Sequence, residues 1–327
     1  MIRNKITFAE AINAATIQSM ELEKNVFVFG IGVDKQGNIF GTTQNIKEKF
    51  GSDRIFDTPS SEQALTALAA GAANANLRPI LVHQRLDFMI YSFDQIINWI
   101  SLWSFKSSKQ SKMPLTIRAV VGKGWGQGPQ HAKSLHTIFA HIPGLQVVMP
   151  STPYEAKGLL MSSIFSNDPT IFIEGRSLFS MTEEVPDEPY FIELSKAKIR
   201  KEGNDLTLVS FGSAMPIALD AAKYLSKINL SMEVIDLRTI KPFDIKTIIQ
   251  SVKKTKNLIV FEPGWKSFSI SSEIIASVSE KIGSKLLNNP KRICWPDSHV
   301  PMSTPLEKEF YPSKEKLINE IKLTLNK

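Results

Sequence analysis

The sequence predicts an α/β protein made of two doubly wound domains. Short apolar runs, many of them β-branched, alternate with longer helical patterns, which is typical of parallel sheets covered on both faces. The chain has 327 residues, 43% of them hydrophobic, which is enough for about two cores. An acidic, proline-containing segment at residues 180–191 predicts a linker between domains at residues 1–185 and 192–327. The predicted strands are residues 26–33, 79–82, 115–121, 145–149, 170–174, 206–211, 232–237, 258–261 and 292–295.

Several predicted helices begin with capping sequences. TFAE at residues 7–10 and TPYE at residues 152–155 have the pattern of capping boxes, and TPLE at residues 304–307 repeats it with proline at the first helical position. Residues 313–327 predict a solvated amphipathic helix with lysines on its outer face.

A carboxylate, Glu62, falls in the first turn of another predicted helix. Ser60 suits the N-cap, Gln63 follows three residues later, and a run of small residues continues the helix. A carboxylate at a helix N-terminus stabilises the helix dipole by about 0.3–1 kcal/mol, and this structural role alone explains Glu62. A catalytic role therefore needs support from other residues.

Composition excludes several classes of protein. The net charge of +7 is dispersed along the chain, which is weak support for nucleic-acid binding. A single cysteine, Cys294, excludes an internal disulfide and indicates a reducing compartment. The first residues have no apolar signal core, and no apolar run approaches the ~18 residues of a membrane span. We expect a cytoplasmic protein with no nucleic-acid or membrane partner.

Two segments carry residues suited to ligand binding. GKGWGQGPQH at residues 122–131 follows a predicted strand; its glycines can bring the backbone near a ligand, and His131 can exchange protons. His83 and Phe88 lie just beyond another predicted strand, at the edge where open α/β sheets bind ligands. The structural alternatives are a tight connection for the glycine-rich loop and ordinary boundary or core positions for His83 and Phe88.

Metal and hydrolase chemistry lack their usual patterns. The histidines His83, His131, His136 and His141 form no HxH or HExxH pair, so we expect no metal held by this chain alone. There is also no G-x-S-x-G sequence and no Gly-Asp-Gly followed by Asn.

Ordered motifs extend over essentially the whole chain. They are TFAEAINAA (7–15), RIFDTPSSE (54–62), FDQIIN (93–98), QHAKS (130–134), FAHIPGL (139–145), STPYEAKGLL (151–160), DPTI (168–171), DLRTIKP (236–242) and EPGW (262–265). Together they resemble the β subunit of the E1 component of thiamine-diphosphate-dependent 2-oxoacid dehydrogenases of the pyruvate, branched-chain and acetoin type, in the transketolase-like superfamily.

The resemblance implies a pyrimidine-binding domain at residues 1–185 and a transketolase C-terminal-like domain at residues 192–327. It implies an α2β2 heterotetramer, active only with an E1 α subunit that holds the diphosphate and Mg²⁺ of thiamine diphosphate. The reaction is oxidative decarboxylation of a small 2-oxoacid, with transfer of the acyl group to a lipoyl domain of an E2 acyltransferase.

Four residues acquire roles from this resemblance. Glu62 matches the catalytic carboxylate that hydrogen-bonds N1′ of the aminopyrimidine, and Phe88 matches the aromatic residue packed on that ring. Gln84 matches a polar position near the cofactor. His131 matches the catalytic histidine that faces the substrate and later the lipoyl group.

One departure leaves alternatives open. Where the family commonly has acidic residues after its first strand, this chain has Ile31 and Gly32. This departure motivates one alternative, a non-catalytic partner that stabilises an α chain. A second alternative, within the same fold, is a split transketolase-like enzyme that makes C–C bonds without a lipoyl acceptor.

Overall fold

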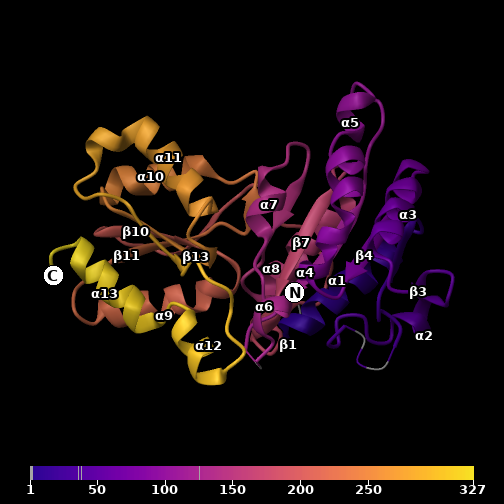
Figure 1. Ribbon diagram of the computed structural model, residues 1–327, viewed down its shortest axis with the longest axis horizontal. Coiled ribbons are helices and arrows are strands. Elements are labelled where there is room, and N and C mark those ends of the chain that lie inside the picture. The colour runs from indigo at the N-terminus through magenta and orange to yellow at the C-terminus, as the bar shows by residue number, and fades with distance from the viewer. Residues whose placement is uncertain (1–2, 36, 38, 125) are drawn as a thin grey trace. The chain divides into compact units, whose positions relative to one another are not determined.

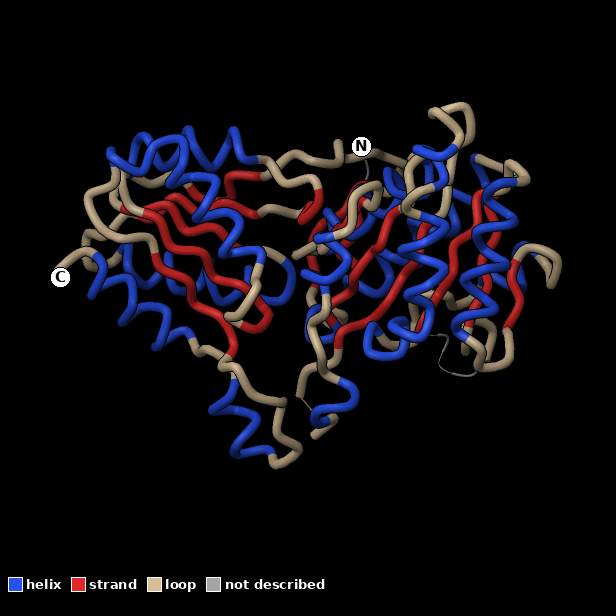
Figure 2. Tube along the Cα trace, turned by 45° about the horizontal axis from the view of Figure 1, so that its top comes forward, coloured by secondary structure: helices blue, strands red, loops and turns tan. Residues whose placement is uncertain are grey.

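The chain forms two compact units, each an α/β layer structure (Figure 1). The computed structural model describes residues 3–35, 37, 39–124 and 126–327. The first unit comprises Met1–Lys123 and Ile138–Leu194, and the second comprises Gly124–Thr137 and Ser195–Lys327. In the first unit, strands lie between layers of helices, as Figure 2 shows. The α/β prediction is confirmed.

Parallel strands form the sheet of the first unit. Its order is β6-β7-β5-β4-β2-β3, and all these neighbours pair in parallel. Because carboxyl ends of parallel strands share one edge, the segments that follow β2, β4 and β7 lie at the same side of the sheet. The strands are β2 (Val26–Gly30), β3 (Ile55–Asp57), β4 (Arg78–His83), β5 (Thr116–Val121), β6 (Gln146–Val148) and β7 (Thr170–Gly175).

Helices and a two-stranded ribbon complete the first unit. The ribbon pairs β1 (Arg3–Thr7) with β8 (Thr182–Pro186) in antiparallel register. The helices are α1 (Phe8–Leu22), α2 (Ile46–Phe50), α3 (Glu62–Asn74), α4 (Leu86–Met89), α5 (Trp103–Lys106) and α8 (Pro153–Phe165), with 3-10 turns Ile90–Ser92 and Arg176–Leu178 and a π-helix Gln95–Ile100. Helix α7 (His136–His141) belongs to this unit from Ile138 onward, and its first two residues belong to the second unit.

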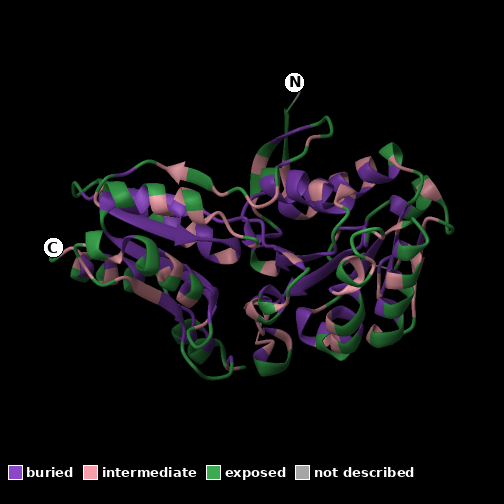
Figure 3. Ribbon diagram, turned by 90° about the horizontal axis from the view of Figure 1, so that it is seen from above, coloured by how far each residue is buried: buried purple, intermediate pink, exposed green. Residues whose placement is uncertain are grey.

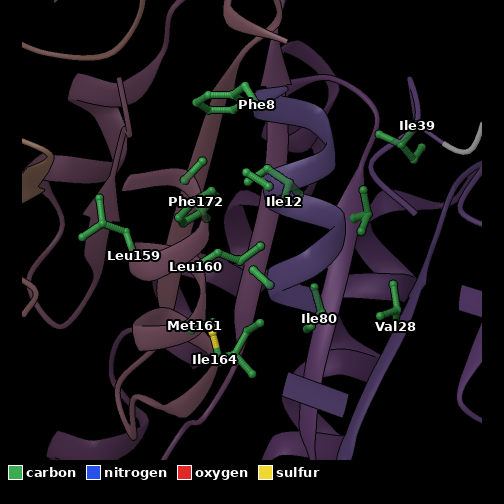
Figure 4. Packing of buried hydrophobic residues seen from close by; sticks show 14 of the residues in the cluster. Phe8, Ile12, Val28, Ile39, Ile80, Leu159, Leu160, Met161, Ile164 and Phe172 are labelled. Carbon is green, nitrogen blue, oxygen red and sulfur yellow. The ribbon is translucent and has the colours of Figure 1, made fainter. Parts of the chain in front are cut away.

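The core of the first unit lies between α1, α8 and the sheet. Phe8 and Ile12 of α1 meet Leu160 of α8 and Phe172 of β7, all without solvent exposure (Figure 4). Burying side chains of this size contributes about 1.5–3 kcal/mol each. Helix α1 begins where predicted, because Thr7 and Glu10 form a reciprocal capping box.

The second unit is a smaller sheet with one antiparallel edge. Its order is β14-β13-β10-β11-β9, with only β9 antiparallel to its neighbour among the described strands. Figure 3 shows the strands of this unit as largely buried. The elements are β9 (Lys198–Lys201), β10 (Leu206–Ser210), β11 (Met232–Asp236), β12 (Thr239–Lys241), β13 (Leu258–Trp265), β14 (Lys291–Trp295), α6 (Gly128–His131), α9 (Met215–Ser226), α10 (Ile245–Thr255), α11 (Ile270–Ile282), α12 (Thr304–Phe310) and α13 (Lys314–Thr324), with 3-10 turns Gly212–Ala214 and Gly283–Lys285.

The structure differs from the sequence-based expectations at several ends of elements. Thr152 caps α8 as predicted, but Ser303 rather than Thr304 precedes α12, and its side chain makes no cap bond. Helix α3 follows Ser61 rather than Ser60, again without a side-chain cap. Caps depend on local backbone angles that the residue pattern alone does not determine.

The acidic segment at residues 180–191 is only partly a connection. Its first half forms β8, which pairs with β1, and the change between the two compact units falls between Leu194 and Ser195. The predicted end of the first domain, at residue 185, lies inside β8. No helix among the described residues is long and apolar enough to cross a membrane.

A buried ion pair joins two central strands. Arg118 of β5 donates to both carboxylate oxygens of Glu174 on β7, at 2.6 and 3.1 Å, and both side chains are 1% exposed. We predict that Arg118→Met lowers the free energy of unfolding by about 3–5 kcal/mol, because it leaves a buried charge uncompensated.

Urea denaturation measures this effect, with Arg118→Met/Glu174→Leu as the matched control. The double variant should recover most of the lost free energy, since neither charge remains. A single variant as stable as the wild type would contradict the prediction.

Candidate functional site

A cavity of about 270 Å³ opens in the first unit at the carboxyl edge of its sheet. It contains three of the four residues singled out from the sequence, Glu62, Gln84 and Phe88, which come from the start of α3 and the segment after β4. The full lining is Ile31, Ser60, Glu62, His83, Gln84, Arg85 and Phe88. Parallel pairing of β2 with β4 brings these segments together.

Glu62 is the first residue of α3, and its side chain is half-buried. The approach to the helix is held to the sheet, because the N–H of Thr58 donates to the carbonyl of Gly30 at 3.1 Å. Within α3, the hydroxyl of Thr66 donates to the carbonyl of Glu62 at 2.8 Å. These contacts hold a carboxylate at a helix N-terminus, facing the cavity.

The turn after β2 is organised by Asp57 at the end of β3. Its carboxylate accepts the N–H groups of Gly32 and Val33 and pairs with Lys35 at 2.6 Å. Burial raises the pKa of Asp57, but Lys35 and the two N–H groups outweigh it and hold that pKa below its ordinary value. The turn leaves Ile31 as an apolar wall of the cavity.

Gly32 occupies a position where acidic residues are common in the family that the sequence resembles. Its φ is +79°, and a Cβ there would lie 2.6 Å from Nε2 of Gln84. An acidic residue at this position would be strained and would displace the amide. The glycine and Gln84 are therefore a compatible pair in this cavity.

Phe88 does not occupy a core position. It lies on the short helix α4, partly exposed, with its ring on the cavity wall. A flat apolar surface at this point can pack on an aromatic ligand. Gln84 is exposed, so its amide is accessible to a ligand.

His83 closes the cavity from inside as a neutral side chain. It is 1% exposed, and burial lowers its pKa to about 4. Its Nε2 lies 3.1 Å from the hydroxyl of Thr66, which lies 2.9 Å from that of Ser92. Among the described residues, Nδ1 of His83 has no hydrogen-bond partner.

Arg85 also lines the cavity, although the sequence analysis assigned it no role. Burial lowers its pKa, while the charge of Asp87 acts in the opposite direction. The sequence feature that indicates a place in the cavity is the position of Arg85 immediately beyond a predicted strand.

His131 belongs to the second unit, at the end of the four-residue helix α6. The glycine-rich loop before it is held by Glu307 of α12, which accepts the N–H groups of Gly124 at 2.8 Å and Gly126 at 3.3 Å. The glycines were expected to bring this loop's backbone near a ligand. In the structure the backbone instead approaches the carboxylate of Glu307, a side chain of the protein itself. Glu307 does this in place of the predicted capping box at residues 304–307.

His136 has a structural partner in the second unit. Its Nε2 lies 2.8 Å from Glu262, and its Nδ1 lies 2.9 Å from the hydroxyl of Ser134. Glu262 also accepts the N–H of Ser271 at the start of α11, at 2.7 Å. In the part of the chain that the structure describes, no group of three His, Cys, Asp or Glu side chains is arranged to hold a metal ion.

The chain is similar to known proteins over nearly its whole length. Residues 4–181 match the transketolase pyrimidine binding domain, and residues 195–317 match the transketolase C-terminal domain. It is 39% identical over 322 residues to the pyruvate dehydrogenase E1 component subunit beta of Staphylococcus epidermidis, covering 98% of this chain and 99% of that one. The corresponding protein of Staphylococcus aureus is 38% identical over the same shares.

Two solved structures share the fold. A split gene transketolase, described as an inactive beta4 tetramer, has a TM-score of 0.82 at 21% identity, covering 98% of this chain and 99% of that one. The transketolase of Leishmania mexicana has a TM-score of 0.72 at 18% identity, covering 98% of this chain and 46% of that one. The transketolase-like fold expected from the sequence motifs is confirmed.

The Glu307 contacts predict a change in backbone protection. In Glu307→Gln, amide exchange at Gly124 and Gly126 should become about tenfold faster, because charge-assisted hydrogen bonds are lost. Hydrogen exchange read by mass spectrometry measures this, with the exposed Glu309→Gln of the same helix as control. Equal exchange in both variants would contradict it.

Buried His83 predicts a pH dependence of stability. Its pKa in the folded state, about 4, lies below the ordinary 6.5, so the unfolded chain binds the proton first as pH falls. Between these two pH values, His83 should lower the free energy of unfolding by about 1.4 kcal/mol for each pH unit of acidification.

Urea titrations from pH 6.5 to 4.5 test this sign. His83→Gln should lower the slope of stability against pH, whereas His141→Gln, at an exposed position, should keep it. The prediction fails where both variants follow the wild-type slope.

Proposed function

Because this chain belongs to the family of pyruvate dehydrogenase E1 component beta subunits, we propose that it is the β subunit of a 2-oxoacid dehydrogenase. The reaction is the oxidative decarboxylation of a small 2-oxoacid on thiamine diphosphate, with transfer of the acyl group to a lipoyl domain. The observation that supports it is the cavity in which Glu62, Gln84 and Phe88 meet.

The donors and surfaces of this cavity fit an aminopyrimidine ring. Such a ring needs a carboxylate for a ring nitrogen, flat apolar contact and polar groups for its exocyclic amine. The three contacts are offered by Glu62, Phe88 and Gln84, and Ile31 adds an apolar wall.

Each residue has a defined task in this proposal. Thiamine diphosphate, when bound, supplies the electron sink for the carbanion that decarboxylation leaves. Glu62 hydrogen-bonds N1′ of the aminopyrimidine and exchanges the proton at that atom. Phe88 packs on the ring and, with Ile31, excludes water from one side. His131 faces the substrate and later the lipoyl group, where an imidazole assists proton transfer.

Partner chains complete the proposed enzyme. An E1 α subunit holds the diphosphate and Mg²⁺ in an α2β2 heterotetramer, and activity requires that subunit. An E2 lipoyl acyltransferase receives the acyl group. The absence of a Gly-Asp-Gly…Asn pattern from this sequence is compatible with this division of labour. We place the complex in the cytoplasm.

The carboxylate at position 62 is the first test. In the complex with its native α chain, thiamine diphosphate and Mg²⁺, Glu62→Gln should lower reduction of an artificial oxidant by about 100-fold or more, because the amide cannot exchange the proton at N1′. The exposed Glu48→Gln of the same unit is the matched control and should keep full activity.

A panel of 2-oxoacids then names the substrate. Turnover of one acid that Glu62→Gln removes, together with acylation of a lipoyl domain, supports the proposal. Ketol transfer to a sugar phosphate without lipoyl acylation would instead identify a split transketolase-like enzyme. Unchanged activity of the complex in Glu62→Gln would identify a non-catalytic partner.

A further inference from the structure

Two arginines converge beside the proposed cofactor cavity. Arg85 follows β4, and Arg176 begins the 3-10 turn that follows β7. Strand β5 lies between these two strands and pairs in parallel with both, so their carboxyl ends are about 10 Å apart at one edge of the sheet. This is the edge at which the cavity opens.

Phe40 holds both side chains in place. The guanidinium carbon of Arg176 lies 4.6 Å from the centroid of this ring, and that of Arg85 lies 5.5 Å from it. Arg176 also lies 5.0 Å from the ring of Phe179. These cation–π contacts limit the positions that the two guanidinium groups can take, so both positive charges are held beside the same ring.

The two cations act on each other. Burial lowers the pKa of Arg176, and the charge of Arg85 lowers it further. Asp87, the carboxylate that acts on Arg85, offsets part of this charge. Bringing two guanidinium groups together in a partly buried place is unfavourable, and an oxyanion bound by both would relieve the repulsion.

We propose that Arg85 and Arg176 bind an anionic group of the substrate, distinct from the carboxylate that decarboxylation removes. Resting on the proposed function, this makes the substrate a 2-oxoacid with a carboxylate or phosphate at its far end. Arg85 supplies the link between the two sites, since it also lines the cavity with Glu62 and Phe88. Arg85 and Arg176 are each partly exposed, so the arginine pair can be reached by a ligand from solvent.

Matched substrates test the charge requirement. In the complete complex, 2-oxoglutarate is compared with 2-oxopentanoate, which has the same five-carbon skeleton without the second carboxylate. The phosphate source is tested with 3-phosphohydroxypyruvate against hydroxypyruvate. We expect kcat/KM at least about tenfold higher for one of the acids with a second anionic group than for its neutral-tailed analogue.

Substitution of Arg176 assigns the effect to this pair. Arg176→Met should raise KM for the preferred dianion by about tenfold or more and leave the kinetics of its neutral-tailed analogue unchanged. Arg176→Lys should recover part of the loss, and the exposed Arg3→Met should behave as wild type. Equal use of dianion and analogue, with no effect of Arg176→Met, would overturn the proposal.

Inorganic phosphate tests the site without turnover. Thermal unfolding of the full chain is followed in phosphate and in chloride at equal ionic strength. The melting temperature should rise with phosphate in the wild type and Arg3→Met, but not in Arg176→Met. A complex that decarboxylates no 2-oxoacid but keeps this phosphate effect would reject the proposed function and retain the anion site. Loss of the phosphate effect in an active complex without dianion preference would reject the anion site alone.

Discussion

The close approach of the backbone at Gly30 to the neighbouring strand underlies the whole site. A Cβ at this position would lie 2.2 Å from the carbonyl oxygen of Val82, and φ is +148°, so only glycine fits. Here the chain leaves β2, and the N–H of Ile31 donates to the same carbonyl at 3.3 Å. The end of β2 and the end of β4 are thereby fixed against each other, and both line the cavity.

Rigid polar contacts then hold the loops around this edge. Asp57 holds the turn after β2 through backbone N–H groups, and the hydroxyl of Thr66 links the start of α3 to His83. In the second unit, Glu307 accepts the N–H groups of Gly124 and Gly126, and Glu262 pairs with His136. Buried carboxylates with several donors are costly to move, which favours a single arrangement of the chain.

The cavity combines residues that the proposed cofactor role assigns with residues that distinguish this chain from the common family pattern. Glu62 and Phe88, which we propose as the carboxylate and the aromatic ring for the aminopyrimidine, line the cavity. Gly32 and Gln84 are in close contact at the turn where acidic residues are common in the family. Arg85 and Arg176 stand beside this arrangement and add positive charge on the rings of Phe40 and Phe179. Variation in such edge loops can change which substrate is bound while the strands stay the same.

The sequence by itself determined the features that depend on near neighbours. Each predicted apolar run overlaps a strand, and Thr7 and Thr152 cap their helices, because periodicity and capping act over a few residues. The ordered motifs identified the family. Only the tertiary structure decided the partners of distant side chains. Glu307 accepts a hydrogen bond from the loop at Gly124, 183 residues earlier, in place of the predicted cap of α12. His136 pairs with Glu262, and the guanidinium groups of Arg85 and Arg176 both lie over the ring of Phe40. No local pattern encodes these pairs, since chain folding alone sets which strand ends and loops become neighbours.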